Sequence, residues 1–314
     1  AVWFTAKNST KPIGRMATDG TVPTEFATEP GSTPDSITTG PDGNLWYTDG
    51  NKVGKMTTAG VVTVYNGFGI IGGRGIAAGP DGNLWVVDGQ GDQLVAVKPD
   101  GTKADAVLFP TAGANGQQIV RGPDGNMWFT TSNTDKVGRL NLGVTPHTIT
   151  EFAIAPGSGA RGITVGPDGN LWFTESDADK VGRITTSGTI TEFAVTGGSG
   201  PWGIVAGPDG NLWFTERYGN RIGRITTSGT VTEYAIPTAN SDPMYIAAGP
   251  DGALWFTEFG ADQVGRITIA GTVTDEFSLL RANAEPWAIV AGSDGALWLT
   301  EFGGNRIVRM STSG

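Results

Sequence analysis

Fourteen residues of this sequence form seven pairs with the spacing and chemistry of a possible site. The members of each pair lie fourteen positions apart, with the aspartate of a tight turn halfway between them in every case. The pairs are Asp35 and Asp49, Arg74 and Asp88, Gln117 and Thr131, Arg161 and Glu175, Trp202 and Glu216, Met244 and Glu258, and Trp287 and Glu301. Seven of the fourteen residues are carboxylates, which on convergence raise one another's pKa or recruit a hard cation such as Mg²⁺ or Ca²⁺.

Two strands joined by the central turn must position each pair. A separation of fourteen residues around a turn predicts that the two members are direct cross-strand partners at one end of a hairpin. If the first strand of each hairpin is the innermost strand of a ring, the pairs surround the mouth of a central channel. The predicted ligand-binding residues at this mouth are Asp35, Asp49, Arg74, Asp88, Arg161, Glu175, Trp202, Glu216, Tyr245, Glu258, Trp287 and Glu301. A metal ion there would use Glu175, Glu216 and Glu258; no other cofactor is indicated.

The hairpins belong to a repeat of about 42 residues. Its motif tryptophans are Trp3, Trp46, Trp85, Trp128, Trp172, Trp213, Trp255 and Trp298. Each repeat divides at its turns into four short strands, which we call A to D, and no stretch has a helical period. The period fits one four-stranded blade, so we predict a single all-β domain, a β-propeller with antiparallel blades. Eight B strands favour eight blades, with seven as the alternative, because the first unit lacks strand A and the last lacks strand D.

The repeats set the expected unit boundaries within the single domain. The units are predicted near residues 1–28, 34–66, 73–109, 116–155, 160–196, 201–237, 243–278 and 286–314. The chain begins inside a repeat motif, which predicts a processed or trimmed product. Units five and six match at most positions, which also suits recent duplication or design, although the divergent loops at 66–73 and 112–118 argue against pure design.

The amino-acid composition limits the classes of partner that this protein could bind. The formal net charge is −10 with 17% charged residues, which argues against nucleic acid or an anionic membrane surface. No apolar run approaches the length of a membrane span, and the absence of cysteine rules out thiolate chemistry. We expect a small-molecule or peptide ligand and a monomer, with unpaired edges at the incomplete blades that would allow edge-to-edge association.

Simpler structural roles compete with the functional ones. The tryptophans of strand B are expected to be core residues, and the turn aspartates to serve the turn rather than calcium, because the loop offers too few oxygen ligands. Each strand-B glutamate can equally bond a neighbouring N–H or arginine. The repeated strand-C Arg or Lys is expected to pair with a strand-D glutamate. His147, the single histidine, is expected to be exposed on the opposite face from the channel mouth.

The repeated Gly-Pro-Asp-Gly-Asn-Leu-Trp-Phe-Thr-Glu, followed by Lys-Val-Gly-Arg-Ile-Thr-Thr-Ser-Gly, resembles the streptogramin (virginiamycin B) lyase family over essentially the whole chain. The resemblance implies a propeller that opens a cyclic depsipeptide by elimination at an ester. It also implies a histidine general base in the second position of the Pro-x-Gly segment, a strand-B glutamate and a bound magnesium ion. The corresponding positions here are Asp35, Arg74, Gln117, Arg161, Trp202, Met244 and Trp287, and none is histidine.

The departure from the family pattern decides the expected function. A histidine general base contributes about 10²–10⁴-fold to rate, so its loss favours a non-catalytic, ligand-binding or scaffold propeller, extracytoplasmic or secreted by family habit. The alternative is a Mg²⁺- or Ca²⁺-dependent lyase or hydrolase that acts on an ester or lactone through the carboxylate ring. A divalent ion held by several strand-B carboxylates would favour the enzyme.

Overall fold

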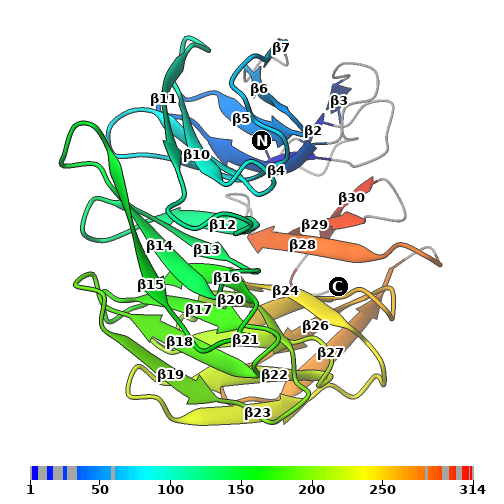
Figure 1. Ribbon diagram of the computed structural model, residues 1–314. Coiled ribbons are helices and arrows are strands. Elements are labelled where there is room, and N and C mark those ends of the chain that lie inside the picture. The colour runs from blue at the N-terminus through cyan, green and yellow to red at the C-terminus, as the bar shows by residue number, and fades with distance from the viewer. Residues whose placement is uncertain are drawn as a thin grey trace.

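The computed structural model describes residues 2–5, 13–16, 24–26, 34–57, 61–279, 282–291, 297–301, 306–310 and 312. Within these ranges the regular structure consists of strands, arranged as eight antiparallel sheets that follow one another along the chain (Figure 1). Six sheets have four strands, and the first and eighth have three. In these ranges we find no helix with the length and apolar character needed to cross a membrane.

The strands of the first four sheets pair in chain order. The first sheet contains β1 (Val2–Thr5), β2 (Ile13–Met16) and β3 (Thr24–Phe26). The second contains β4 (Pro34–Thr39), β5 (Leu45–Asp49), β6 (Lys52–Met56) and β7 (Val62–Tyr65). The third contains β8 (Gly73–Ala78), β9 (Leu84–Asp88), β10 (Gln93–Val97) and β11 (Lys103–Leu108). The fourth contains β12 (Gly116–Arg121), β13 (Met127–Thr131), β14 (Lys136–Asn141) and β15 (Thr148–Ala153).

The other four sheets repeat the same order. The fifth contains β16 (Ala160–Val165), β17 (Leu171–Glu175), β18 (Lys180–Ile184) and β19 (Ile190–Ala194). The sixth contains β20 (Pro201–Ala206), β21 (Leu212–Glu216), β22 (Arg221–Ile225) and β23 (Val231–Ala235). The seventh contains β24 (Pro243–Ala248), β25 (Leu254–Glu258), β26 (Gln263–Ile267) and β27 (Val273–Ser278). The eighth contains β28 (Pro286–Ala291), β29 (Leu297–Glu301) and β30 (Arg306–Met310).

The A strands lie at the centre of this arrangement. From β4 through β8, β12, β16, β20 and β24 to β28, each A strand contacts the next, whereas the D strands lie at the periphery (Figure 1). Strand β1 contacts both β4 and β29, so the first sheet stands between the second and the eighth. The prediction of a β-propeller with four-stranded antiparallel blades is confirmed. The eight sheets agree with the count of B strands, and the first and eighth have the strands B–D and A–C that the sequence predicts.

The Gly-Pro-Asp-Gly turn holds the tryptophan that follows it. In the fifth sheet, Asp168 Oδ1 accepts the backbone N–H of Asn170 at 3.2 Å and the indole N–H of Trp172 at 3.0 Å. The amide of Asn170 donates to the other carboxylate oxygen at 2.7 Å. The second, third, fourth, sixth and seventh sheets repeat the aspartate–indole bond. The expectation of a turn role for these aspartates is confirmed, and the bond to the indole is an addition to it.

The strand-C arginines join neighbouring sheets. The Arg183 guanidinium lies over the rings of Trp172 and Phe193, and its Nη1 donates to the Thr227 carbonyl of the next sheet at 2.8 Å. Arg139 and Arg224 make equivalent contacts. The predicted pairing of these arginines with strand-D glutamates is therefore wrong. Strand D presents an aromatic ring to the guanidinium, whereas the glutamate directly before that ring in sequence contacts the residue that begins strand C, as Glu192 does with Lys180.

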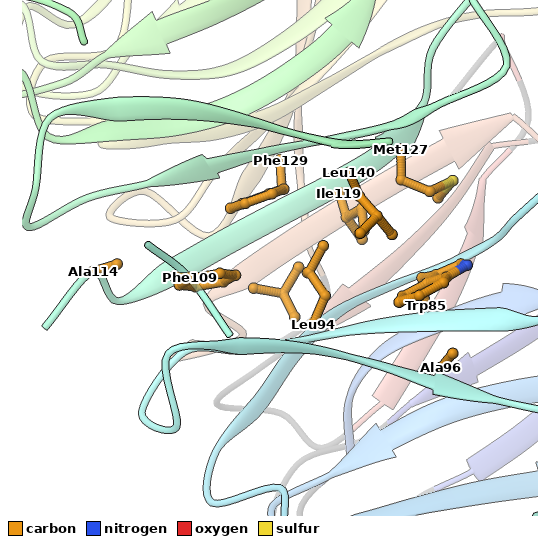
Figure 2. Close-up of a cluster of buried hydrophobic side chains, with 10 residues drawn as sticks. Trp85, Leu94, Ala96, Phe109, Ala114, Ile119, Met127, Phe129 and Leu140 are labelled. Atoms are coloured by element: carbon orange, nitrogen blue, oxygen red, sulfur yellow. The ribbon is translucent and has the colours of Figure 1, made fainter. Parts of the chain in front are cut away.

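The hydrophobic core lies between successive sheets. The motif tryptophans of the second to seventh sheets are fully buried, as predicted for these positions. Between the third and fourth sheets, Phe109 stacks on Phe129 with ring centroids 4.8 Å apart, and Leu94 and Ile119 fill the space beside them (Figure 2). Burial of such side chains stabilises each sheet by about 1.5–3 kcal/mol per residue, so each unit depends on its neighbours for its core.

Candidate functional site

A β-bulge at the start of every described A–B hairpin changes the predicted pairing. Glu216 pairs with Pro201, fifteen residues before it, because the register shifts between Pro201 and Ile204. The hairpins of the second, fourth, fifth, seventh and eighth sheets shift in the same way, and so does that of the third. The predicted direct pairing at a spacing of fourteen is therefore wrong by one residue. Since alternate residues of a strand face opposite sides, the bulge separates the two members of each pair.

The strand-B carboxylates are the buried members of these separated pairs. Asp88, Glu175, Glu216 and Glu258 are each 0% exposed, and Asp49 is 5% exposed. The partners predicted for them are mostly only half-buried, as are Arg74, Gln117, Arg161, Trp202 and Trp287. The residues predicted at the mouth therefore form two groups. The strand-A side chains make an accessible rim, and the strand-B carboxyl groups are enclosed behind it. Asp35 and Glu301 lie on β4 and β29, but their side chains are outside the described part of the structure.

A threonine in strand B fixes the backbone of this rim. Thr215 Oγ1 accepts the Gly203 N–H at 3.0 Å, at the bulge of its own sheet, and donates to the Met244 carbonyl of the next sheet at 2.8 Å. Thr174 makes the same two bonds, to the N–H of Gly162 and the carbonyl of Trp202. The backbone carbonyl of five of these strand-A residues accepts such a bond from the preceding sheet, at Arg74, Arg161, Trp202, Met244 and Trp287. The bulge leaves an N–H out of the ladder, and this hydroxyl satisfies it.

The most developed part of the rim surrounds Trp202. The guanidinium carbons of Arg161 and Arg217 lie 4.7 Å and 5.1 Å from the centroid of its ring. Asp242 accepts two hydrogen bonds from Arg217, at 2.7 Å from Nε and 3.2 Å from Nη2. This carboxylate raises the pKa of Arg217 further above its ordinary value, so the guanidinium stays charged. Arg161 makes no ion pair with the described residues, and its Nε is buried without a described hydrogen-bond partner.

A second aromatic group continues the rim into the seventh and eighth sheets. Trp287, at the start of β28, lies 6.0 Å from Tyr245 and 5.7 Å from Phe259 between ring centroids. Tyr218, beside Arg217, is 65% exposed. We call this set the aromatic rim, and it consists of Arg161, Trp202, Arg217, Tyr218, Asp242, Tyr245, Phe259 and Trp287. Offset or edge-on aromatic pairs and guanidinium–ring contacts are each worth about 0.5–2 kcal/mol, which favours a preformed surface.

The enclosed glutamates have raised pKa values. Burial raises the pKa of Glu175 to about 7, against the opposing effect of a 2.6 Å hydrogen bond from Ser158. Burial likewise raises the pKa of Glu216, although Arg221 and Ser199 donate to it at 2.8 Å. One oxygen of each carboxyl group, Oε1, has no hydrogen-bond partner among the described residues. These groups are proton acceptors of unusual strength for a carboxylate, but they are shut away from the rim.

Glu258 is the most perturbed of the three. Burial, and then the nearby charge of Glu276, raise its pKa to about 8. Ser241 and Glu276 lie close to its carboxyl group, yet neither oxygen of that group makes a hydrogen bond of normal geometry with a described residue. Glu258 is therefore protonated at neutral pH in the absence of a cation.

The aspartates of the second and third sheets have structural environments. Asp88 accepts four hydrogen bonds of 2.9–3.0 Å, from the N–H groups of Ile71, Gly72 and Gly91 and from the amide of Gln93. Three of the four donors are backbone groups of turns and loops, so this carboxylate ties a loop to a hairpin. Asp49 is buried in the equivalent place.

The three predicted metal ligands are not brought together. Glu175, Glu216 and Glu258 end the B strands of three different sheets, and each is enclosed with its own serine. Among the described residues, no group of three or more His, Cys, Asp or Glu side chains could hold a metal ion. The rim itself presents guanidinium groups and aromatic rings. These residues do not fit the magnesium ion that the family resemblance implies.

The single histidine is partly buried rather than exposed. His147 Nδ1 lies 2.8 Å from Asp105 Oδ2 of the preceding sheet, and its ring meets Trp85 edge-on at 5.6 Å. It precedes β15, in the connection from β14. The prediction that it is exposed is wrong, because the neighbouring blade packs against that connection. No rim residue is among its described contacts.

A repeated clamp between sheets was missed at the sequence level. Asp179, in the turn before β18, has a φ of 54° and accepts the N–H groups of Gly198 at 2.7 Å and Gly200 at 2.9 Å. These glycines lead into the next A strand. Asp92, Asp135, Asn220 and Asp262 hold the corresponding loops. The available signal was an Asp or Asn before strand C in successive repeats, since these residues tolerate the left-handed conformation.

The accessible and the enclosed groups of this region differ in chemistry. The accessible rim offers aromatic faces and the Arg161 guanidinium, which makes no ion pair with a described residue, whereas the strand-B glutamates with raised pKa values are enclosed. The rim carboxylate Asp242 is engaged by Arg217.

Comparison with known proteins agrees with the fold and with the sequence motifs. A family model described as the virginiamycin B lyase family matches residues 1–102 and 69–314. Virginiamycin B lyase from Staphylococcus aureus is 34% identical, with a TM-score of 0.76 over 88% of this chain and 94% of that one. A streptogramin B lyase structure is also 34% identical, with a TM-score of 0.76 over 88% and 93% of the two chains. No curated protein matches.

A third structure bears on binding without turnover. It is a catalytically inactive histidine-to-alanine variant of the Staphylococcus aureus lyase with quinupristin, 34% identical to this chain. Its TM-score is 0.78, over 91% of this chain and 97% of that one. In that relative, loss of one histidine goes with loss of catalysis while the ligand is still present in the structure.

Proposed function

The chain belongs to the virginiamycin B lyase family, and from that premise we propose that it is a non-catalytic member that binds its ligand at the aromatic rim. The ligand we infer carries at least one planar aromatic group and a negative charge. The observation that carries the proposal is the stack of the Arg161 and Arg217 guanidinium groups on the Trp202 ring. Arg161 and Trp202 stand at positions where the family resemblance expects histidine.

The missing base supports the non-catalytic part of the proposal. None of the seven positions is histidine, and His147 packs on Asp105 and Trp85 instead. The strand-B glutamates have raised pKa values but are fully buried. A base of suitable pKa that no substrate proton can reach does not catalyse elimination.

The rim chemistry supports the ligand class. Trp202 is half-buried, so part of its ring remains accessible to a planar group that stacks on it. Arg161 lies over Trp202 with no described carboxylate partner. A planar guanidinium both stacks and donates bidentate hydrogen bonds to a carboxylate or phosphate. The rim is thus positively charged at this point on a protein of net charge −10.

The test uses two kinds of probe. Virginiamycin B reports binding and ring opening together, through tryptophan fluorescence and chromatography of the recovered ligand. N-acetyltryptophan and its neutral amide report the preference for a negative charge. We expect virginiamycin B to bind and to be recovered intact, and the anionic amino-acid derivative to bind more tightly than the amide.

A matched pair of arginine variants locates the site. Arg161→Gln should weaken binding of the charged probe about tenfold, in line with about 1–2 kcal/mol for a partly desolvated cation–π and charge contact. Arg121→Gln, at the other end of an A strand and exposed, should leave binding unchanged. Recovery of ring-opened virginiamycin B would overturn the non-catalytic assignment and revive the alternative lyase or hydrolase. Binding equally reduced by both variants, or no binding of any probe, would overturn the rim as the site.

A further inference from the structure

A basic side chain occupies the same place in three consecutive sheets. In the fourth, Lys136 begins strand C and reaches Glu151 of strand D, with Nζ 2.7 Å from Oε2. In the fifth, Lys180 Nζ lies 2.6 Å from Oε2 of Glu192. In the fourth sheet the residue cross-strand from this lysine is Thr131, whereas in the fifth it is the buried Glu175, so there the positive charge lies at the end of the sheet where a strand-B carboxyl group is buried.

The sixth sheet shows the full arrangement. Arg221 Nε lies 2.8 Å from Glu216 Oε2 of strand B and 3.5 Å from Glu233 Oε2 of strand D. One cation is therefore shared by two carboxyl groups, one enclosed and one half-buried. The fifth sheet has the same pair in Glu175 and Glu192, with Lys180 between them in sequence and cross-strand from Glu175.

The seventh sheet keeps both carboxyl groups and loses the cation. Glu258 and Glu276 take the places of Glu216 and Glu233, but the residue cross-strand from Glu258 is Gln263. Glutamine is neutral, so the pair has no positive side chain of its own sheet. Glu276 Oε1 is bonded to the Thr238 N–H at 3.0 Å, the same inter-sheet contact that Glu233 makes with Thr196. The strand-D glutamate is therefore held in the same way in the sixth and seventh sheets, although the strand-C residue is arginine in one and glutamine in the other.

Four oxygen atoms around this place make no hydrogen bond of normal geometry with a described residue. Both carboxyl oxygens of Glu258, the Oγ of Ser241 and the Oε1 of Gln263 are buried and unpartnered among the described residues. Glu258 and Ser241 are 0% exposed. Leaving one buried polar group unsatisfied costs about 1–3 kcal/mol, and here four such atoms belong to three side chains of one small region. In the fifth and sixth sheets the equivalent serine hydroxyl donates to the glutamate.

We propose that a monovalent cation from solution, K⁺ or an ion of similar size and charge, binds in the seventh sheet in the place that Lys180 and Arg221 fill in the fifth and sixth. Its ligands are oxygen atoms of Glu258, Glu276, Ser241 and Gln263. Alkali cations exchange their hydration shell for such oxygen ligands. K⁺ has the charge of a lysine ammonium group and about its size, so it restores the arrangement that the neighbouring sheets achieve with side chains.

The charge count favours a single positive charge. The fifth and sixth sheets balance two carboxyl groups with one cationic side chain each, and the raised pKa of Glu175 shows that the remaining negative charge is partly neutralised by a proton. The described part of the structure also brings no third acidic ligand to this place, of the kind that divalent sites gather. Gln263 and Glu276 are half-buried and not sealed, which provides the path by which an ion enters.

The site is tested by thermal unfolding at pH 9 in KCl against choline chloride at constant ionic strength. A ligand that binds only the folded state stabilises it by RT ln(1 + [L]/Kd). The unfolding midpoint should therefore rise by roughly 2 °C for each tenfold increase of K⁺ above its Kd. A crystal soaked in RbCl should show an anomalous peak between Glu258, Glu276 and Gln263.

Two reciprocal variants separate a bound ion from a general salt effect. Gln263→Lys supplies the cation as a side chain, so it should raise stability in choline chloride and abolish the K⁺ dependence. Lys180→Gln should create a second K⁺-dependent site in the fifth sheet. The proposal is overturned if KCl and choline chloride give the same midpoint, which would mean that a proton or the Gln263 amide serves the carboxyl groups. A response to Ca²⁺ with none to K⁺, or a rubidium peak elsewhere only, would overturn it as well.

Discussion

At the scale of single residues, the strand-B glutamate shows how neighbours decide the behaviour of one side chain. Glu175, Glu216 and Glu258 have the same backbone position and the same complete burial. They differ in what lies opposite on strand C, which is Lys180, Arg221 and Gln263 in turn. Burial opposes ionisation and a nearby cation favours it, so the pKa of Glu258 rises to about 8 where no cationic side chain is present.

This difference predicts a pH dependence of stability. In choline chloride, Glu258 is protonated in the folded protein up to about pH 8, whereas in the unfolded chain it ionises near pH 4.5. The contribution of Glu258 to the free energy of unfolding is fully present below about pH 4.5 and is lost as the pH rises through 8. The reason is that, between these pH values, the unfolded state releases a proton that the folded state keeps. Urea unfolding should therefore show stability falling by a few kcal/mol over this window.

Two glutamine variants check the assignment. Glu258→Gln should remove the slope between pH 7 and 8, where Glu175, with a pKa of about 7, has already titrated. Glu175→Gln should reduce the slope below pH 7 only. A wild-type slope above pH 7 that survives in Glu258→Gln would contradict the raised pKa of this residue.

At the scale of elements, each A–B hairpin joins its bulge to the next sheet through one hydroxyl. Thr215 satisfies the freed Gly203 N–H and holds the Met244 carbonyl, and Thr174 does the same for Trp202. The third sheet has Val87 at this place and lacks the hydroxyl. The element that positions the aromatic rim is therefore the bulged hairpin together with the threonine of the preceding sheet.

Thr215→Val removes both hydrogen bonds while preserving shape. Two buried backbone groups lose their partner, so we expect a loss of about 2–4 kcal/mol in the free energy of unfolding, measured by urea denaturation. Thr63→Val, at an exposed position of β7, is the control and should change stability by less than about 0.5 kcal/mol. An equal effect of the two substitutions would show that the bridge contributes nothing.

Gly203 permits the close approach of neighbouring A strands. A Cβ at this position would stand 2.8 Å from the Met244 carbonyl oxygen, and that backbone cannot move without disturbing β24. Gly203→Ala should therefore cost about 1–3 kcal/mol of stability and weaken ligand binding at Trp202, the adjoining residue. Gly197→Ala is the matched control, because nothing lies within 4 Å of its added methyl group. Calorimetric unfolding of both variants decides whether the contact is as tight as the geometry states.

At the scale of the whole molecule, each sheet is fastened to the next at several depths. The tryptophan–aromatic stack and the strand-C arginine lie near the outside, the core cluster between them, and the threonine bridge near the centre. The Asp or Asn clamps hold the loops that lead into the next A strand. Because neighbouring sheets share core and hydrogen bonds, stability depends on nearest-neighbour interfaces, as in other repeat architectures.

The clamp at Asp179 provides a test of that dependence. Asp179→Ala removes two charge-assisted bonds to backbone N–H groups and places alanine at a φ of 54°. We expect about 2–4 kcal/mol of destabilisation from the lost bonds and the left-handed backbone. Asp179→Asn should be much milder, since Asn220 occupies the equivalent place one sheet later. Hydrogen exchange at the Gly198 and Gly200 amides should accelerate in the alanine variant only, and uniform acceleration in both variants would refute the clamp.

The sequence by itself determined the architecture. A tryptophan recurs about every 42 residues, and each one after Trp3 is preceded by Gly-Pro-Asp-Gly or a close relative. This repeat sets the strands, the sheet order and the burial of the strand-B aromatics, because these follow from local turn chemistry and periodicity. The candidate residues of the rim, Arg161, Trp202, Tyr245 and Trp287, were also found at this level. They stand at one position of the repeat, or directly beside it, and a repeat carries one position to one place in every blade.

Only the tertiary structure decided which of those residues act together. A one-residue bulge moved Glu175, Glu216 and Glu258 off the rim, and a bulge depends on the approach of the next sheet rather than on local propensity. The neutral residue at Gln263 gains its meaning only from Glu258 and Glu276, which strand pairing places beside it. Strand register and the desolvation of a carboxyl group are set by residues distant in sequence, and no motif records them.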